Sequence, residues 1–163
     1  SAASDVYKRQ PRGSAHQGLR EYQAPVEYGR SEIIRKGKKI AVLGVGSMIP
    51  SCMEICKGLK DDGYDPTFVN ARFVKPLDVD LLDELAKDHS LFVTVEENVK
   101  SGGYGEHVSA YMEACHPEIR VLSAAVWDRF VPQGNVESLR SRIGLGVEDI
   151  RQAIEDSEEL REQ

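Results

Sequence analysis

Short apolar runs that alternate with segments of helical period constrain the fold of this chain more than any other feature. Leu91–Val95 is too apolar and too short to be anything but a central strand. Thr67–Val69 and Arg120–Val126 are further strand candidates, and helical segments separate the three. Strands that alternate with helices form βαβ units, whose crossovers are right-handed and whose strands are parallel. The pattern therefore predicts an α/β fold, a three-layer open sheet covered on both faces.

Two more strand candidates lie near the start of the regular pattern. Glu32–Arg35 precedes the turn Lys36–Lys38, and that turn leads into Lys39–Leu43. A connection this short favours an antiparallel pair. We therefore expect a mostly parallel sheet with one antiparallel edge strand, formed by pairing these two segments.

Apolar residues at helical spacing predict the helices between the strands. Ser47 is a candidate N-cap for the first helix, and Asp78 is the expected cap of the second. A helix around Val136–Arg142 precedes the last one. Four further sets of residues each form the apolar face of one predicted helix, in chain order: Met48, Cys52, Ile55, Cys56 and Leu59; Leu81, Leu82, Leu85 and Ala86; Val108, Tyr111, Met112 and Cys115; and Val147, Ile150, Ala153 and Ile154.

Charge and hydropathy exclude several classes of protein. The formal net charge is −6, with acidic residues gathered near the C-terminus, whereas nucleic-acid-binding proteins usually carry a basic face. No apolar run approaches the roughly 18 residues that a membrane-spanning helix needs, and the N-terminus lacks the apolar region of a secretory signal. We expect a soluble, cytoplasmic protein with no nucleic-acid partner and no membrane partner.

The three cysteines do not indicate a disulfide framework or a metal site. Cys52 and Cys56 are four residues apart in a predicted helix, so they share one face of it, and Cys115 lies far away in the sequence. No CxxC or HxxxH spacing accompanies them. We expect reduced thiols that pack as small apolar side chains, and no metal ligands.

Ligands of open α/β sheets gather at the carboxyl ends of the strands, where four loops are expected: Gly44–Ser47, Asn70–Lys75, Glu96–Gly105 and Asp128–Gly134. The first loop lacks the third glycine of a dinucleotide-binding turn, because Ile49 stands there, so a tight strand-to-helix connection is favoured.

Charged residues in these loops have both functional and structural interpretations. Glu96 and Glu97 are neighbours on a strand and point to opposite faces, so a shared acid/base role is disfavoured. One of them is a candidate to bind backbone N–H groups or a basic group of a partner. The basic residues could bind phosphate or simply solvate the surface; they are Arg12, Arg72, Lys75 and Arg129. The histidines are scattered, and we expect no catalytic residue in this chain.

Several of these loops also resemble one family. Phe68–Asp78 is similar to the NARFVKPLD segment of the 1-deoxy-D-xylulose-5-phosphate synthases, and Val93–Gly105 resembles their VTVEEN…GGFG run. Asp128–Gly134 is similar to their DRFVPQG loop and Leu139–Leu145 to their LRAELGL helix. The similarity runs in order from about residue 26 to residue 155. It identifies the chain as the transketolase C-terminal-like domain of this family.

The resemblance implies a transferase that joins pyruvate to glyceraldehyde 3-phosphate, giving 1-deoxy-D-xylulose 5-phosphate and carbon dioxide for isoprenoid, thiamine and pyridoxal biosynthesis. Thiamine diphosphate and magnesium serve that chemistry, and two preceding domains of the parent hold them. The magnesium motif and the glutamate that activates the cofactor are missing from this sequence. The isolated chain is thus expected to be inactive, to bind neither group, and to serve packing and assembly of a homodimer.

The resemblance also divides the chain. Residues 1–10 are expected to be foreign or disordered, residues 11–30 to be a remnant of the preceding domain with a linker, and residues 31–163 to form the α/β domain. Arg12 lies in a segment similar to YPRG, which implies a substrate-phosphate ligand in the intact enzyme only. The implied interface or structural loop residues are Arg72, Lys75, Glu96, Glu97, Asn98, Gly102, Gly103, Asp128 and Arg129.

Two other hypotheses remain open on the sequence. The first is a partner-docking C-terminal domain of a transketolase or of a 2-oxoacid dehydrogenase β subunit, which pull-down of a lipoyl-bearing partner would favour. The second is an independent small-ligand domain that uses Gly44–Ser47, which a nucleotide-induced thermal shift would favour.

Overall fold

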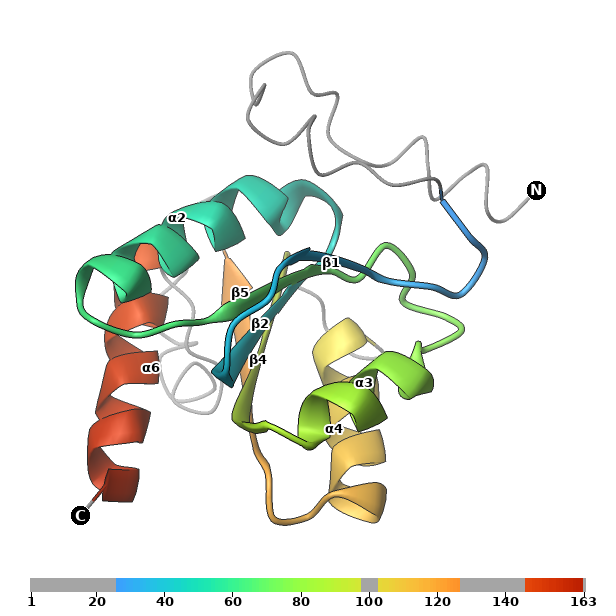
Figure 1. Ribbon diagram of the computed structural model, residues 1–163. Helices are drawn as coiled ribbons and strands as arrows, with labels where there is room; N and C mark the ends of the chain where they lie inside the picture. Colours follow the sequence, from blue (N-terminus) through green and yellow to red (C-terminus); the bar gives the residue numbers. More distant parts are fainter. Residues whose placement is uncertain (1–25, 98–102, 127–145, 163) are drawn as a thin grey trace, which may run out of the picture.

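A computed structural model describes residues 26–97, 103–126 and 146–162. These residues form one five-stranded sheet with helices on both of its faces (Figure 1). The strand order is β1-β3-β2-β4-β5. The strands are β1 (Glu32–Arg35), β2 (Lys39–Gly44), β3 (Thr67–Asn70), β4 (His89–Glu97) and β5 (Arg120–Val126). The helices are η3 (Gly46–Met48), α2 (Ile49–Asp61), α3 (Val79–Ala86), α4 (Tyr104–Cys115) and α6 (Val147–Glu162). This is the three-layer α/β architecture that the alternating pattern predicts.

The antiparallel edge strand is present, but its predicted partner is wrong. β1 pairs antiparallel with β3, whereas β2 pairs parallel with both β3 and β4. The turn between β1 and β2 explains the difference, because its N–H groups bond to the segment that enters β3. Lys38 N donates to Asp65 O at 2.8 Å, and Gly37 N donates to Thr67 Oγ1 at 2.8 Å. The turn therefore steps over the start of β3 instead of closing a hairpin.

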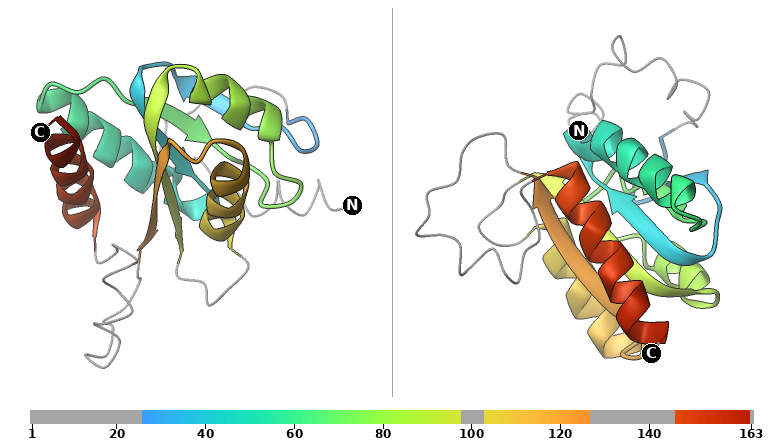
Figure 2. Two further views of the ribbon diagram at one scale, coloured as in Figure 1. Left: turned by 90° about the horizontal axis from the view of Figure 1, so that it is seen from below. Right: turned by 90° about the vertical axis from the view of Figure 1, so that its left-hand side faces the viewer.

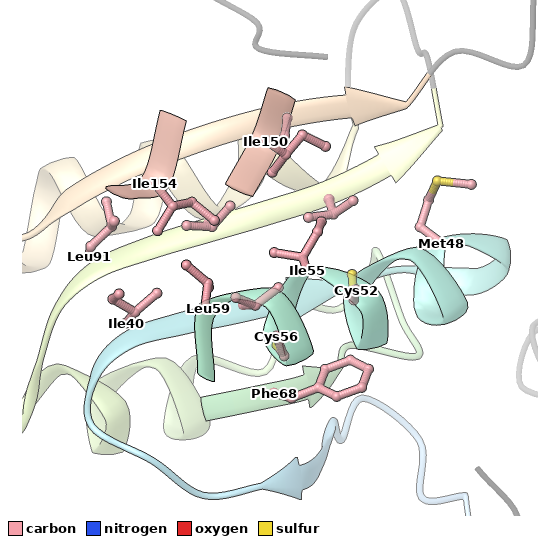
Figure 3. Packing of buried hydrophobic residues seen from close by; sticks show 14 of the residues in the cluster. Ile40, Met48, Cys52, Ile55, Cys56, Leu59, Phe68, Leu91, Ile150 and Ile154 are labelled. Atoms are coloured by element: carbon pink, nitrogen blue, oxygen red, sulfur yellow. The ribbon is translucent and has the colours of Figure 1, made fainter. Parts of the chain in front are cut away.

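One face of the sheet is covered by α2 and α6 (Figures 1 and 2). Figure 3 shows Cys52, Ile55 and Leu59 of α2 directed at the strands, with Ile150 and Ile154 of α6 beside them. These five side chains are fully buried, and they occupy the spacing that predicts one apolar helix face. Transfer of such apolar surface out of water stabilises this layer.

The opposite face is covered by α3 and α4. Leu82 and Leu85 of α3 and Val108 and Met112 of α4 pack on Phe92, which is fully buried. Along β4, Leu91, Val93 and Val95 contact the α2 layer and Phe92 contacts the α3 layer. The strand is apolar on both sides for this reason, as a central parallel strand must be.

The helix starts separate a correct cap prediction from a wrong one. Asp78 caps α3, because its Oδ1 accepts a hydrogen bond from Leu81 N at 3.2 Å. Ser47 does not cap α2: it lies within η3, and Met48 occupies the N-cap position without a side-chain bond. The helix predicted around Val136–Arg142 lies outside the described residues. Within the described ranges, no helix has the length and apolarity needed to cross a membrane.

Candidate functional site: the carboxyl edge of the sheet

The carboxyl ends of β2, β3 and β4 lie side by side, because their register places Gly44 against both Asn70 and Val95. This edge is where an open α/β sheet binds ligands. The loops that follow these strands lead to the N-termini of α2, α3 and α4. A helix N-terminus presents unpaired N–H groups and a partial positive charge, so it attracts anions. The groups that meet each helix start therefore decide what the edge can bind.

The N-terminus of α4 is occupied by the carboxylate of Glu96. Its Oε1 accepts a hydrogen bond from Tyr104 N at 3.0 Å, and its Oε2 accepts one from Gly105 N at 2.6 Å. Gly103, at the N-cap position, makes no side-chain cap. Glu96 thus does for α4 what a capping side chain or a bound anion does elsewhere.

Gly105 is required for this close approach of helix and sheet. A Cβ at this position would lie 2.7 Å from Thr94 Oγ1, 2.8 Å from Glu96 Oε2 and 3.0 Å from Ser123 Oγ. Thr94 Oγ1 is buried and has no hydrogen-bond partner among the described residues. The start of α4 is consequently packed too closely against β4 and β5 to leave room for a ligand atom at Gly105.

Glu97 points away from Glu96 and meets a different loop. Its Oε1 accepts a hydrogen bond from Ser47 Oγ, which ties the end of β4 to the turn after β2. Glu97 is exposed, and Glu96 is partly buried. The two carboxylates therefore do not form an acid/base pair, and each joins two parts of the carboxyl edge.

The start of α3 is occupied by Asp78 in a similar way. Besides Leu81 N, this carboxylate accepts a hydrogen bond from Ser31 N at 2.8 Å. Arg30 Nη1 lies 3.5 Å from Asp78 Oδ1 and 2.9 Å from Asp80 Oδ2. Asp78 thus joins the β3–α3 loop to the segment that enters β1.

Arg72 is held inside the domain. Its guanidinium Nη2 lies 2.6 Å from Glu32 Oε2, and the two side chains are only 5% and 9% exposed. Arg72 also adopts a positive φ of 63°, which is uncommon for a residue other than glycine. Asn70 Oδ1 accepts a hydrogen bond from Arg72 N at 3.1 Å and helps to fix this turn. The structure thus places the arginine in a buried ion pair with β1, a partner that no local pattern indicates.

Two of the remaining candidates are described by the structure, and the others lie outside the described residues. Lys75 is exposed and precedes a cis peptide bond to Pro76, and Gly103 is buried at the start of α4. Five candidates lie outside the described residues: Arg12, Asn98, Gly102, Asp128 and Arg129.

The glycine turn after β2 is shaped by helix packing. A Cβ at Gly44 would lie 2.5 Å from Cys52 Sγ and 3.1 Å from Ile49 Cδ1, so α2 approaches the strand closely there. Gly46 has a positive φ of 55°, which glycine adopts without strain. These contacts account for both glycines without a nucleotide.

The cysteines do not supply a reactive centre at this edge. Cys52 and Cys56 are buried and free, and Cys115 is exposed and free. Burial raises the pKa of Cys52 well above its usual value and raises the pKa of Cys56 to about 12, so both remain thiols at neutral pH. In the described part of the chain, no group of three His, Cys, Asp or Glu residues is arranged to hold a metal ion.

At the opposite edge of the sheet, the structure shows a cluster that the sequence analysis missed. Asp83 Oδ1, on α3, lies 2.6 Å from the hydroxyl of Tyr111 and 2.7 Å from Nε2 of His116. Tyr111 lies on α4, and His116 follows that helix. The position of His116 before a proline was the only local signal, and nothing in the sequence placed α3 beside it.

The fold is an open α/β domain, and the polar groups at its carboxyl edge form hydrogen bonds and ion pairs with one another. The family model described as "Transketolase, C-terminal domain" matches residues 29–150. A "Split gene transketolase, inactive beta4 tetramer" superposes with a TM-score of 0.67 at 28% identity, covering 82% of this chain and 43% of that one. The chain belongs to the transketolase C-terminal domain family.

Curated relatives indicate which members of this family the chain resembles. The 1-deoxy-D-xylulose-5-phosphate synthase of Lachnoclostridium phytofermentans is 38% identical over 143 residues, covering 87% of this chain and 23% of the synthase. The synthase of Dictyoglomus thermophilum is 39% identical over 137 residues, covering 84% of this chain and 22% of the synthase. The chain therefore spans less than a quarter of the length of these relatives. The resemblance of the chain to this family is confirmed.

Proposed function

We propose that this chain is the C-terminal domain of a thiamine-diphosphate-dependent transferase of the 1-deoxy-D-xylulose-5-phosphate synthase type. Such an enzyme condenses pyruvate with glyceraldehyde 3-phosphate, releases carbon dioxide, and supplies isoprenoid, thiamine and pyridoxal biosynthesis. In this proposal residues 31–163 form the domain, which packs against the rest of the enzyme and supports a cytoplasmic homodimer. The domain makes and breaks no bonds of its own.

One observation carries this division of roles: the domain's own carboxylates fill two of the three helix N-termini at this edge, those of α3 and α4, where an anionic ligand would bind. Glu96 occupies the start of α4 and Asp78 the start of α3. Phosphates of substrates and cofactors are attracted to such helix starts in α/β proteins. A phosphate at either place would have to displace a carboxylate that already accepts two backbone hydrogen bonds. The arrangement therefore favours a structural role for these carboxylates over the binding of a phosphate ligand.

The described residues do not fit the cofactor site that the family implies. Thiamine diphosphate supplies a carbanion as its ylid, and magnesium holds its diphosphate through oxygen ligands. The acidic side chains at the carboxyl edge are committed elsewhere, since Glu97 accepts from Ser47 and Asp78 from Ser31. We assign both groups to the other domains of the parent. The synthase names of the curated relatives also favour this enzyme over a dehydrogenase β subunit.

A domain exchange tests the proposal. Residues 26–163 replace the corresponding C-terminal segment of the Lachnoclostridium phytofermentans synthase, and the same synthase without that segment serves as the control. We expect the exchanged enzyme to form 1-deoxy-D-xylulose 5-phosphate and the truncated one to form none. The isolated chain should show no heat of binding with thiamine diphosphate and magnesium in calorimetry. Tight binding by the isolated chain would contradict the proposed division of roles.

A further inference from the structure

We propose that the outer edge of β1, with Tyr28 and Ile33, is the surface on which the rest of the same polypeptide docks. The inference rests on the proposed function, because it requires the chain to be one domain of a longer enzyme. It adds the place of contact, which neither the fold nor the comparisons assign.

Exposed apolar side chains single out this surface. Among the residues that the structure describes, Tyr28 and Ile33 are the exposed large hydrophobic side chains, at 63% and 39% of their full accessibility. They lie five residues apart in the segment that enters the sheet. The ring of Tyr28 packs edge-on against the buried ring of Phe73, with centroids 5.6 Å apart. Tyr28 is thus held in place while most of its surface faces outward, which is the state of a preformed contact residue.

Within the described residues, the strand itself is an open edge. There β1 pairs on one side with β3 and is the last strand of the sheet in that direction (Figure 1). Edge strands of soluble proteins are usually protected by charged side chains that repel further pairing. Here both charges of β1 are engaged within the domain, Glu32 with Arg72 and Arg35 with Asp65. What the edge presents outward is therefore Ile33, backbone groups and the ion-paired Arg35, whose side chain is 34% exposed.

The rest of the polypeptide is the occupant that fits best. The relatives are more than four times as long as the matched segment, so a parent of that kind holds most of its surface outside this domain. The family match begins at residue 29, next to Tyr28, and in the proposed parent the other domains precede this point. A covalently joined neighbour has a high effective concentration, so even a small apolar surface is enough for docking.

A second copy of this chain fits the surface less well. β1 is only four residues long and its register with β3 shifts between Ile33 and Arg35. Pairing two such strands would bury far less than the roughly 1,200 Å² of a stable interface between separate molecules. Covalent linkage therefore favours the neighbouring domain over self-association.

Cysteine labelling tests the proposal without relying on turnover. The background is Cys115→Ser, because Cys115 is the exposed cysteine of the described residues, while Cys52 and Cys56 are buried. Ile33→Cys is compared with Glu113→Cys, an exposed position on α4. Maleimide reaction rates are measured in the 163-residue chain and in the exchanged full-length enzyme. We expect Ile33→Cys to react at least about tenfold more slowly in the full-length enzyme, and Glu113→Cys to change much less.

Equal rates for Ile33→Cys in the two proteins would overturn the proposal. Protection that appears in the 163-residue chain and grows with its concentration would also overturn it, by making a second copy the occupant. Tyr28→Cys lies outside the strand and repeats the measurement if Ile33→Cys perturbs folding. An active exchanged enzyme with an unprotected Ile33→Cys would refute the docking surface alone. An inactive exchanged enzyme with a protected one would instead count against the proposed function.

Discussion

Polar groups lie at both ends of the parallel strands, the carboxyl edge and the opposite, amino edge, and different chemistry holds them at each. At the carboxyl edge, carboxylates of Glu96 and Asp78 accept hydrogen bonds from backbone N–H groups at helix starts. At the amino edge, His89 and His116 are the polar centres, and their partners are side chains and a carbonyl. The first arrangement places carboxylates at the positive ends of helix dipoles, whereas the second joins imidazole rings to hydroxyl, carboxylate and carbonyl oxygens.

His89 forms hydrogen-bond contacts with residues of β3 and α3 at the amino edge. The carbonyl of Leu85 can only accept, so the Nδ1 of His89 at 2.8 Å carries a proton. Thr67 Oγ1 accepts a hydrogen bond from Gly37 N and lies 2.6 Å from Nε2 of His89. One hydroxyl therefore links the turn before β2, the start of β3 and the start of β4. The comparison teaches that polar groups at both ends of the strands bond to one another within the domain, and four substitutions probe them in turn.

The largest effect is expected at the buried ion pair of the carboxyl edge. Glu32→Ala removes the carboxylate that Arg72 contacts at 2.6 Å and leaves a nearly buried guanidinium without this counter-charge. The free energy of unfolding should fall by about 3–5 kcal/mol, measured by urea denaturation. The double variant Glu32→Ala with Arg72→Met should be less destabilised than the sum of the single variants. Additive losses would show that the two side chains are not energetically coupled.

The next effect is expected at the amino edge. Thr67→Val keeps the shape of a fully buried side chain and removes its hydroxyl, so Gly37 N and His89 Nε2 each lose a partner. Unsatisfied buried polar groups make this substitution cost about 2–3 kcal/mol in thermal or urea unfolding. Thr67→Ser retains the hydroxyl and is the matched control, with a loss of about 1 kcal/mol for the missing methyl group. If the serine variant is the less stable one, the hydroxyl is not what holds this edge.

A smaller loss is expected from Glu96→Ala. It removes two hydrogen bonds from the start of α4, and the free energy of unfolding should fall by about 1–2 kcal/mol. Formate added at millimolar concentration should raise the melting temperature of this variant more than that of the unmodified chain, because a small carboxylate can enter the vacated place. Glu97→Ala, at the adjacent exposed position, is the control and should cost less. Equal losses at the two positions would remove the distinction between a helix cap and a surface bond.

The sequence separation between interacting residues explains which features of the fold could be predicted from the sequence. The Asp78 cap was predictable because donor and acceptor are three residues apart. The strands were predictable because burial on both faces leaves a local apolar run, as in Leu91–Val95. The partner of β1 was mispredicted because the contacts of its turn with Asp65 and Thr67 outweigh turn length.

The candidate site was less predictable, because its partners are distant in the sequence. Arg72 lies 40 residues from Glu32, and His116 lies 33 from Asp83. Neither pair has a sequence spacing from which the contact could be predicted. Of the two adjacent glutamates, the alternation of a strand predicts that they diverge, but only the fold shows that Glu96 is the one that reaches the start of α4.

The smallest effect is expected from Asp83→Asn, and it should depend on pH. Hydrogen bonds from the Tyr111 hydroxyl and from His116 hold the pKa of Asp83 below its ordinary value of 3.8. A carboxyl whose pKa is depressed in the folded state stabilises the protein above the unfolded pKa, and this contribution is lost as pH falls through the folded pKa. Thermal unfolding should therefore show Asp83→Asn to be less stable at pH 6, with the difference shrinking below about pH 4. Because the Asp83 side chain is 48% exposed, solvent screening keeps the difference small. A difference that stays constant from pH 6 to the acid range would mean that the Asp83 charge contributes nothing, and the contrast between the two edges would then rest on His89 and Thr67 alone.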